Sequence, residues 1–151
     1  MRRRWNRWTG WALIALAFGC GDETIPGPDP EVAPFVGTWD ATEFTVTNDA
    51  NPMQVADLLV NGSFFIVVEP SGLYTATLVY GQLGTFPEVG QISVNGGFIT
   101  LTPSGGSSCP ASSTYAFSGP DYVTLDGPTC FDFNLDGVDE DATAHIEIQR
   151  R

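Results

Sequence analysis

Short segments rich in Val, Ile, Thr, Tyr and Phe recur along the chain after residue 37, and Gly, Pro, Asn or Asp bounds each of them. This pattern is typical of β-strands separated by turns. Residues 52–59 are the single stretch in which we expect a helix. The sequence therefore predicts an all-β domain of eight strands, at residues 38–47, 62–69, 73–80, 88–94, 98–102, 114–118, 122–126 and 142–149.

The connections between these segments predict how the strands are arranged. Residues 70–72, 95–97 and 119–121 are tight three-residue turns of the hairpin type, whereas the other four connections are long. In an antiparallel meander alternate connections lie at the same end, so we expect the tight turns at one end and the long loops at the other. This asymmetry favours an eight-stranded antiparallel up-and-down barrel with a closed end and a loop-rimmed mouth. A β-sandwich is the alternative.

Two segments indicate which faces of the strands are buried. Residues 142–149 alternate between apolar and polar side chains, which is typical of a strand with one face on a core and the other in water. Residues 62–69 are apolar on both faces. We therefore expect the helix at residues 52–59 to cover the outer face of that strand.

The beginning of the chain has the layout of a secretory signal, with a cationic start and an apolar run at residues 11–18. That run is too short for a mature transmembrane helix, which needs about 20 apolar residues. Residues 16–20 resemble the lipobox of bacterial lipoproteins, whose cysteine is acylated and becomes the first residue of the mature chain. The resemblance implies a signal peptide at residues 1–19 and a membrane anchor on Cys20. A soluble secreted protein is the alternative.

The segment after the signal indicates where the protein is held. Residues 20–34 are rich in proline, glycine and acidic residues, so we expect a flexible tether that holds the domain off the membrane. Gly21 follows the cysteine in place of the aspartate that usually marks retention in the inner membrane. We therefore expect the cell envelope as the location, at the outer membrane, on its periplasmic or surface face.

The charge of the chain excludes two classes of partner. Acidic residues number 18 and basic residues 6, which gives a net charge of −12. Four of the six arginines precede Cys20, so cleavage there would leave 18 acidic residues against two arginines. A nucleic-acid-binding surface needs clustered Lys and Arg, so nucleic acid is not a partner. Electrostatic adhesion to anionic lipid is excluded for the same reason, which leaves acyl chains on Cys20 as the contact with the membrane.

The cysteines divide into one lipidation site and one pair. With Cys20 acylated, Cys109 and Cys130 remain in an oxidising compartment, where a disulfide between them can persist. Closing a loop of about 22 residues stabilises a fold by roughly 3 kcal/mol in the chain-entropy model. Two free thiols are the alternative.

Residues 130–141, with the sequence CFDFNLDGVDED, form the motif that most resembles a metal site. They match the first, third, fifth and sixth positions of the calcium-loop pattern D-x-[DN]-x-[DN]-G, with Gly137 at the bend. Thr143 replaces the glutamate expected at the twelfth position, and no flanking helices are predicted, so this is not an EF-hand. A looser calcium site is one interpretation, and a solvated hairpin turn is the other. The predicted ligands are Asp132, Asn134, Asp136, Glu140 and Asp141.

A Gly-x-Trp triplet lies at the start of the first predicted strand, with Gly37 as its first residue and Trp39 as its third. The triplet resembles the first motif of the lipocalins, eight-stranded barrels whose mouths commonly take small hydrophobic ligands. The resemblance implies that Trp39 packs at the closed end and that Arg150 or Arg151 lies across it. It covers residues 35–151, which look most like the small lipocalin-like domains of bacterial lipoproteins.

Little in the chain indicates catalysis. His145 is the single histidine and falls on the polar face of its predicted strand, where a lone histidine is ordinary. The serines between residues 104 and 113 lie in a glycine-rich stretch without a nucleophile motif. Aromatic residues are plentiful, and they can either line a ligand cavity or fill the core of a small barrel.

These observations predict a non-catalytic, lipid-anchored envelope lipoprotein with a lipocalin-like barrel at residues 35–151 that binds a small hydrophobic ligand. The alternative is a structural or protein-interaction module whose acidic rim loop is ordered by calcium. Calcium is the one cofactor that we expect, and the sequence does not identify a protein partner.

Overall fold

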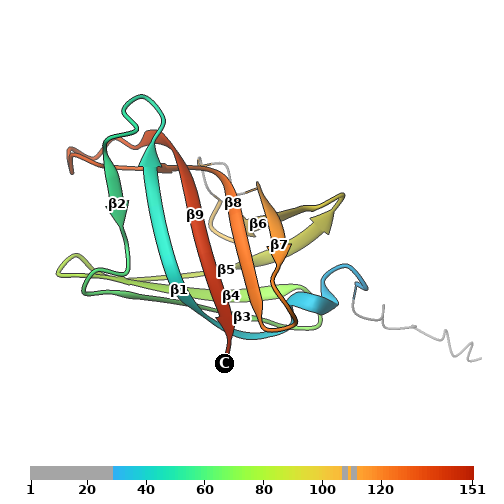
Figure 1. The fold of residues 1–151 in the computed structure, drawn as a ribbon. Helices are drawn as coiled ribbons and strands as arrows, with labels where there is room; N and C mark the ends of the chain where they lie inside the picture. The colour runs from blue at the N-terminus through green and yellow to red at the C-terminus, as the bar shows by residue number, and fades with distance from the viewer. Residues whose placement is uncertain (1–28, 107–108, 110–111) are drawn as a thin grey trace, which may run out of the picture.

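The computed structural model describes residues 29–106, 109 and 112–151 (Figure 1). Within these ranges a short 3-10 helix precedes nine strands. The elements are η1 (Ala33–Phe35), β1 (Gly37–Asn48), β2 (Val55–Asp57), β3 (Ser63–Val68), β4 (Leu73–Tyr80), β5 (Gly84–Asn95), β6 (Phe98–Pro103), β7 (Ser112–Phe117), β8 (Tyr122–Phe131) and β9 (Glu140–Arg150). No helix in the described part of the chain has the length and apolarity that crossing a membrane requires.

The strands form one closed antiparallel sheet. Its order is β2-β1-β3-β4-β5-β6-β7-β8-β9, and pairing of β1 with β9 closes it. β2 and β3 share one edge of β1: β3 pairs with its first residues and β2 with its last. Eight strands therefore make the barrel, and β2 is an additional short strand at its rim. The prediction of an eight-stranded antiparallel up-and-down barrel is confirmed.

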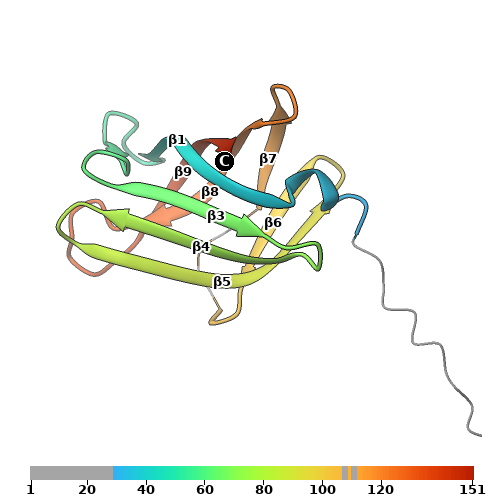
Figure 2. The same ribbon diagram turned by 90° about the horizontal axis from the view of Figure 1, so that it is seen from below.

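The two ends of the barrel differ, as predicted. The turns β3–β4, β5–β6 and β7–β8 lie at one end, together with η1 and the end of β9, and Figure 1 shows η1, the β7–β8 turn and the C-terminus together at the bottom. The β8–β9 loop and the connection from β1 through β2 to β3 lie at the other end. Figure 2 shows β3, β4 and β5 side by side as one wall, with β7, β8 and β9 across the barrel.

The helix predicted at residues 52–59 is wrong. Residues 55–57 form β2, which pairs with Thr45–Thr47 of β1, and the Asp57 carboxylate accepts a hydrogen bond from the Leu59 amide at 2.9 Å in a turn. Leu58 is buried at the mouth end of the core. A helix of about two turns is marginal in isolation, so the backbone partners that β1 offers decide the conformation.

The predicted cover over β3 is wrong for the same reason, because the segment lies beside β1 as a strand. Phe65, on the outer face of β3, is instead approached by the Arg151 guanidinium, whose carbon lies 5.9 Å from the ring centroid. The inner face of β3 is buried through Ile66 and Val68.

Two strands, β8 and β5, are each five residues longer than predicted. β8 continues through Gly127 and Pro128 to Phe131, although these two residues resemble a turn in the sequence. A Cβ on Gly127 would lie 2.7 Å from the Ser112 carbonyl oxygen, so glycine allows close approach of β7. Pro128 lies beyond the last β7 partner, where β8 pairs with β9 alone and a missing N–H is tolerated.

β5 begins at Gly84 instead of residue 88, and this changes the connection before it. Residues 81–83 join β4 to β5 as a tight turn, with Leu83 donating its amide to the Tyr80 carbonyl at 3.0 Å. The expectation of a long loop at this position is wrong. Three of the four predicted long connections therefore remain at the mouth.

The hydrophobic core fills the closed end of the barrel. Trp39, Tyr74 and Val123 are among its most deeply buried side chains, and Phe35 of η1 packs among them. Val32 is also buried there, so the packed part of the chain begins within the segment assigned to the tether. A smaller group of buried residues near the mouth consists of Val46, Leu58, Ala142 and Ala144.

Candidate ligand-binding site

The barrel interior contains a small apolar cavity next to the core. Its volume is about 60 Å³. Trp39 and Phe35 bound it toward the closed end, and Ser113 supplies a polar side chain to its wall. The remaining lining residues are Phe64, Ile66, Val68, Ile92, Ile99, Leu101, Leu125, Ile146 and Ile148.

A larger cavity of about 370 Å³ lies toward the mouth. It shares four lining residues with the deep cavity, so the two spaces adjoin inside one barrel. The shared residues are Phe64, Leu101, Ser113 and Ile146. The other lining residues are Phe44, Ala76, Leu78, Phe86, Pro87, Glu88, Pro103, Cys109, Pro128, Thr129 and Ala144.

Strand periodicity places these side chains inside. In β9 Ala144 and Ile146 line the mouth cavity, whereas His145 between them belongs to the other face. In β5 the even-numbered residues point inward, because Ile92 and Val94 are buried. The same parity brings Glu88 into the mouth cavity, so a carboxylate stands in a mainly apolar wall.

Glu88 is held by a buried tyrosine from the neighbouring strand. Tyr74 of β4 is 2% exposed, and its hydroxyl donates a hydrogen bond to the Glu88 Oε1 atom at 2.5 Å. Gly90 makes room for this contact, since a Cβ at that position would lie 2.8 Å from the Tyr74 hydroxyl. Burial and the adjacent Glu88 carboxylate raise the pKa of Tyr74, so it remains a hydrogen-bond donor at neutral pH.

Trp39 and Arg150 seal the closed end. Trp39 is 0% exposed and donates its indole N–H to the Phe35 carbonyl at 2.7 Å. The Arg150 guanidinium carbon lies 4.1 Å from the centroid of the Trp39 ring. Of the two arginines expected near Trp39, Arg150 is therefore the one that lies across it, and it also donates to the carbonyls of Val36 and Pro34.

Gly37 is required in this closure. Its φ is +136°, and a Cβ there would lie 2.6 Å from an Arg150 guanidinium nitrogen. A larger residue would therefore strain the backbone and displace the arginine. Arg151 lies outside the closure, where it pairs with Asp40 on the surface.

The acidic loop between β8 and β9 is held by its own backbone. The Asp132 carboxylate accepts hydrogen bonds from the amides of Asp136 at 3.1 Å and Gly137 at 2.7 Å. The Asn134 carbonyl oxygen accepts a second bond from the Asp136 amide at 2.9 Å. The Glu140 carboxylate accepts from the Phe133 amide and from the Asn134 side chain, each at 2.9 Å.

Four of the five predicted calcium ligands therefore lie in one hydrogen-bonded loop: Asp132, Asn134, Asp136 and Glu140. Asp141 lies one residue further along β9, where its carbonyl accepts from the Asp49 amide at 3.1 Å. Calcium binding stays a prediction, and calorimetry of the wild type against Asp136→Ala tests it.

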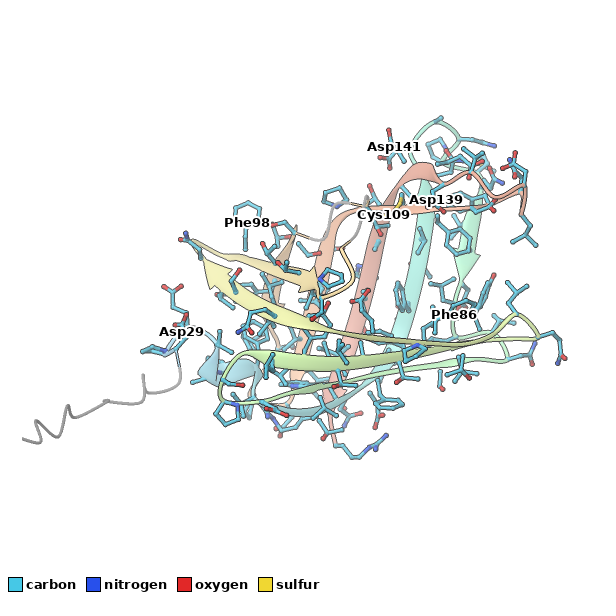
Figure 3. The ribbon with its side chains drawn as sticks, turned by 180° about the vertical axis from the view of Figure 1, so that it is seen from behind. Asp29, Phe86, Phe98, Cys109, Asp139 and Asp141 are labelled. Atoms are coloured by element: carbon cyan, nitrogen blue, oxygen red, sulfur yellow. A yellow bond between two sulfur atoms is a disulfide. The ribbon has the colours of Figure 1, made fainter. Side chains whose placement is uncertain are left out.

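Cys109 and Cys130 form a disulfide with 5.4 Å between their Cα atoms. The bond joins the end of β8 to the connection between β6 and β7, and Cys109 contributes to the wall of the mouth cavity. Figure 3 shows Cys109 and Asp139 close together at the end of the barrel that bears the β8–β9 loop. Cys20, the predicted lipidation site, lies outside the described residues.

His145 lies on the outside of the barrel with a carboxylate partner. Its Nδ1 atom is 2.6 Å from Asp126 Oδ1 on β8. Ligand atoms of Glu43, His145 and Glu147 lie within 4.8 Å of one another, but these side chains are on the outer face of β1 and β9. They do not contribute to the cavity.

Sequence reasoning did not place Glu88 and Tyr74 in a common site. Glu88, Ile92 and Val94 are all even-numbered residues of β5, so they lie on the same face of the strand. Pro87 is unusual in a strand, so the beginning of β5 was not recognised from the sequence. Tyr74 lies diagonally opposite Glu88 on the neighbouring strand, and this follows only from the pairing of β4 with β5, which the sequence does not show.

No protein-family model and no curated protein matches the chain. Among solved structures, the chain is similar to EF1p2_mFAP2b bound to DFHBI, with 16% sequence identity and a TM-score of 0.51 over 80% of this chain and 97% of that chain. It is also similar to a de novo designed fluorescence-activating β-barrel, with 14% identity and a TM-score of 0.42 over 80% of this chain and 98% of the designed one. At such identity the first likeness supports the barrel fold alone.

Proposed function

We propose that this chain is an exported, lipid-anchored envelope lipoprotein whose lipocalin-like barrel binds a small hydrophobic ligand without catalysing a reaction. The observation that carries the binding proposal is the mouth cavity of about 370 Å³. Small-molecule sites are commonly concave spaces of about 300–1,000 Å³ with mainly apolar walls and a few polar groups. The mouth cavity has this size and this kind of wall.

The architecture supports a ligand site at the mouth. Trp39, Arg150 and η1 seal the opposite end, so a ligand enters between the loops. The deep cavity of about 60 Å³ adjoins the mouth cavity and can receive the end of an apolar chain. Burial of such a chain stabilises the complex by about 25 cal/mol per Å² of apolar surface removed from water.

A panel of fatty acids, fatty alcohols, alkylamines and phospholipids tests the binding proposal. We expect at least one class to raise the unfolding temperature of the purified protein and to appear bound at one molecule per chain in native mass spectrometry. If no compound does either, the binding proposal is wrong. The alternative, a protein-interaction module with an acidic rim, would then be favoured.

The anchor proposal is supported by the sequence around Cys20. Residues 1–19 have the layout of a signal peptide, and the residues before Cys20 resemble a lipobox. We expect the expressed protein to incorporate radioactive fatty acid and to fractionate with the outer membrane. The Cys20→Ala variant should lose the label. Equal labelling of the variant would overturn the anchor proposal and leave the binding proposal untouched.

A further inference from the structure

Resting on the proposed function, we infer that the ligand of the mouth cavity carries a cationic amine on a small apolar or aromatic body. The inference comes from Glu88, which is the charged side chain among the described residues that line this cavity. An ionised carboxylate beside this apolar wall offers a ligand cation a charge-assisted hydrogen bond.

Neighbouring residues on β4 and β5 hold the Glu88 side chain in place. Gly90 leaves space for the Tyr74 ring, and the Tyr74 hydroxyl holds one carboxylate oxygen at 2.5 Å. An ionised carboxylate accepts about four hydrogen bonds through its two oxygens, and the tyrosine supplies one. Glu88 itself is exposed. The carboxylate is therefore oriented by the fold and has acceptor capacity left for a donor that enters the cavity.

The described part of the chain supplies no cation to Glu88. It contains three basic side chains, Arg150, Arg151 and His145. Arg150 lies over Trp39 at the closed end, and Arg151 pairs with Asp40 on the surface. His145 contacts Asp126 on the outer face. The chain has no lysine. A positive partner for Glu88 must therefore come from outside these residues.

The rest of the cavity suits a cation with an apolar body. Phe44, Phe64 and Phe86 contribute to its wall, and aromatic rings attract cations as well as apolar groups. The net charge of −12 raises the local concentration of cations and lowers that of anions such as fatty acids. An ammonium donor also gains a Coulomb attraction to the Glu88 carboxylate that a neutral hydroxyl lacks.

Three probes of equal chain length test this inference: decylamine, decanol and decanoate. Each displaces a neutral fluorescent reporter, N-phenyl-1-naphthylamine, from the purified wild-type protein. We expect decylamine to bind about tenfold more tightly than decanol, because its ammonium gains a Coulomb attraction to the Glu88 carboxylate that a hydroxyl lacks. Decanoate should bind most weakly, since its carboxylate meets that of Glu88.

Glu88→Gln tests whether this residue is the cause. Glutamine keeps an oxygen that accepts from Tyr74, so the variant should fold, which circular dichroism checks. We expect the ratio of decylamine to decanol affinity to fall to about one. Glu147→Gln is the matched control: it removes the same charge from the outer face of β9 and should keep the wild-type ratio.

The outcomes separate the two proposals. Equal binding of decylamine and decanol by the wild type, or a preference that survives Glu88→Gln, overturns the amine inference while ligand binding stands. Loss of the preference in Glu147→Gln to the same extent would assign it to overall charge and also overturn the inference. If neither the reporter nor any probe binds, the ligand-binding proposal fails and the amine inference fails with it.

Discussion

Arg150 joins three parts of the closed end through one side chain. Its guanidinium lies over Trp39, donates to carbonyls in and beside η1, and approaches Asp121 in the β7–β8 turn at 3.3 Å. Arg150→Ala removes the cation–π contact and leaves these carbonyls without their donor. We expect the free energy of unfolding to fall by about 2–3 kcal/mol, measured by urea denaturation.

Two further variants serve as controls for the loss of stability expected in Arg150→Ala. Arg150→Lys keeps the charge but lacks the planar fork of donors, so it should recover only part of the lost stability. Arg151→Ala removes a surface pair with Asp40 and should have a smaller effect. Equal losses in Arg150→Ala and Arg151→Ala would show that the contact with Trp39 contributes little.

His145 should titrate above its ordinary pKa. The hydrogen bond to Asp126 raises the pKa of His145, burial opposes this, and the charges of Asp126, Glu43 and Glu147 raise it further. Because the folded pKa lies above the unfolded value of about 6.5, the pair stabilises the fold fully below that pH. The contribution is lost as pH rises through the folded pKa.

His145 is the single histidine in the chain, so its NMR titration is unambiguous. We expect a midpoint above 6.5 in the wild type and a lower one in Asp126→Asn, which keeps the shape but removes the charge. The stability of the wild type should fall more steeply than that of Asp126→Asn between about pH 6.5 and the folded midpoint. A wild-type midpoint at or below 6.5 would contradict the prediction.

At the scale of elements, the disulfide fixes the end of β8 against the connection between β6 and β7. The two cysteines are 21 residues apart, and a bridge over such a loop stabilises by about 3 kcal/mol in the chain-entropy model. We expect reduction to lower the free energy of unfolding by about that amount, measured by denaturation with and without dithiothreitol. The double variant Cys109→Ser, Cys130→Ser should not respond to the reductant. Identical oxidised and reduced transitions in the wild type would contradict the prediction.

Strands with a local signal were predictable, and strands defined by a distant partner were not. β4 lies at residues 73–80 as predicted, and β9 includes its whole predicted segment. Both could be predicted because the alternation of side chains and the flanking turns are features of neighbouring residues. β2 exists because Thr45–Thr47 of β1 offers free backbone groups, which no pattern in residues 52–59 shows. The extension of β8 through Gly127 and Pro128 likewise depends on its neighbours.

For the whole molecule, the barrel and its asymmetric ends follow from the order of turns and loops, but the cavity does not. Its volume depends on how side chains from many strands fill the interior, and no single segment contains that information. The Tyr74–Glu88 contact depends on the register of β4 against β5. The acidic loop could be located from sequence, whereas the backbone amides that hold Asp132 could not.

A substitution that fills the mouth cavity tests whether the ligand binds in that cavity. Ala76 of β4 lines the mouth cavity, whereas Thr75 beside it faces outward and is exposed. We expect Ala76→Phe to place its ring in the cavity and weaken binding of N-phenyl-1-naphthylamine by tenfold or more. The fold should survive, because overpacking costs about 1–3 kcal/mol and open space is at hand.

Thr75→Phe is the matched control, since it adds a similar ring to the same strand on the opposite face. It should bind the reporter as the wild type does, measured by fluorescence titration, with circular dichroism to verify both folds. Equal weakening in the two variants would assign the effect to β4 as a whole. Unchanged binding in Ala76→Phe would place the ligand outside the barrel, because a ring in the mouth cavity and a ligand cannot share the same volume.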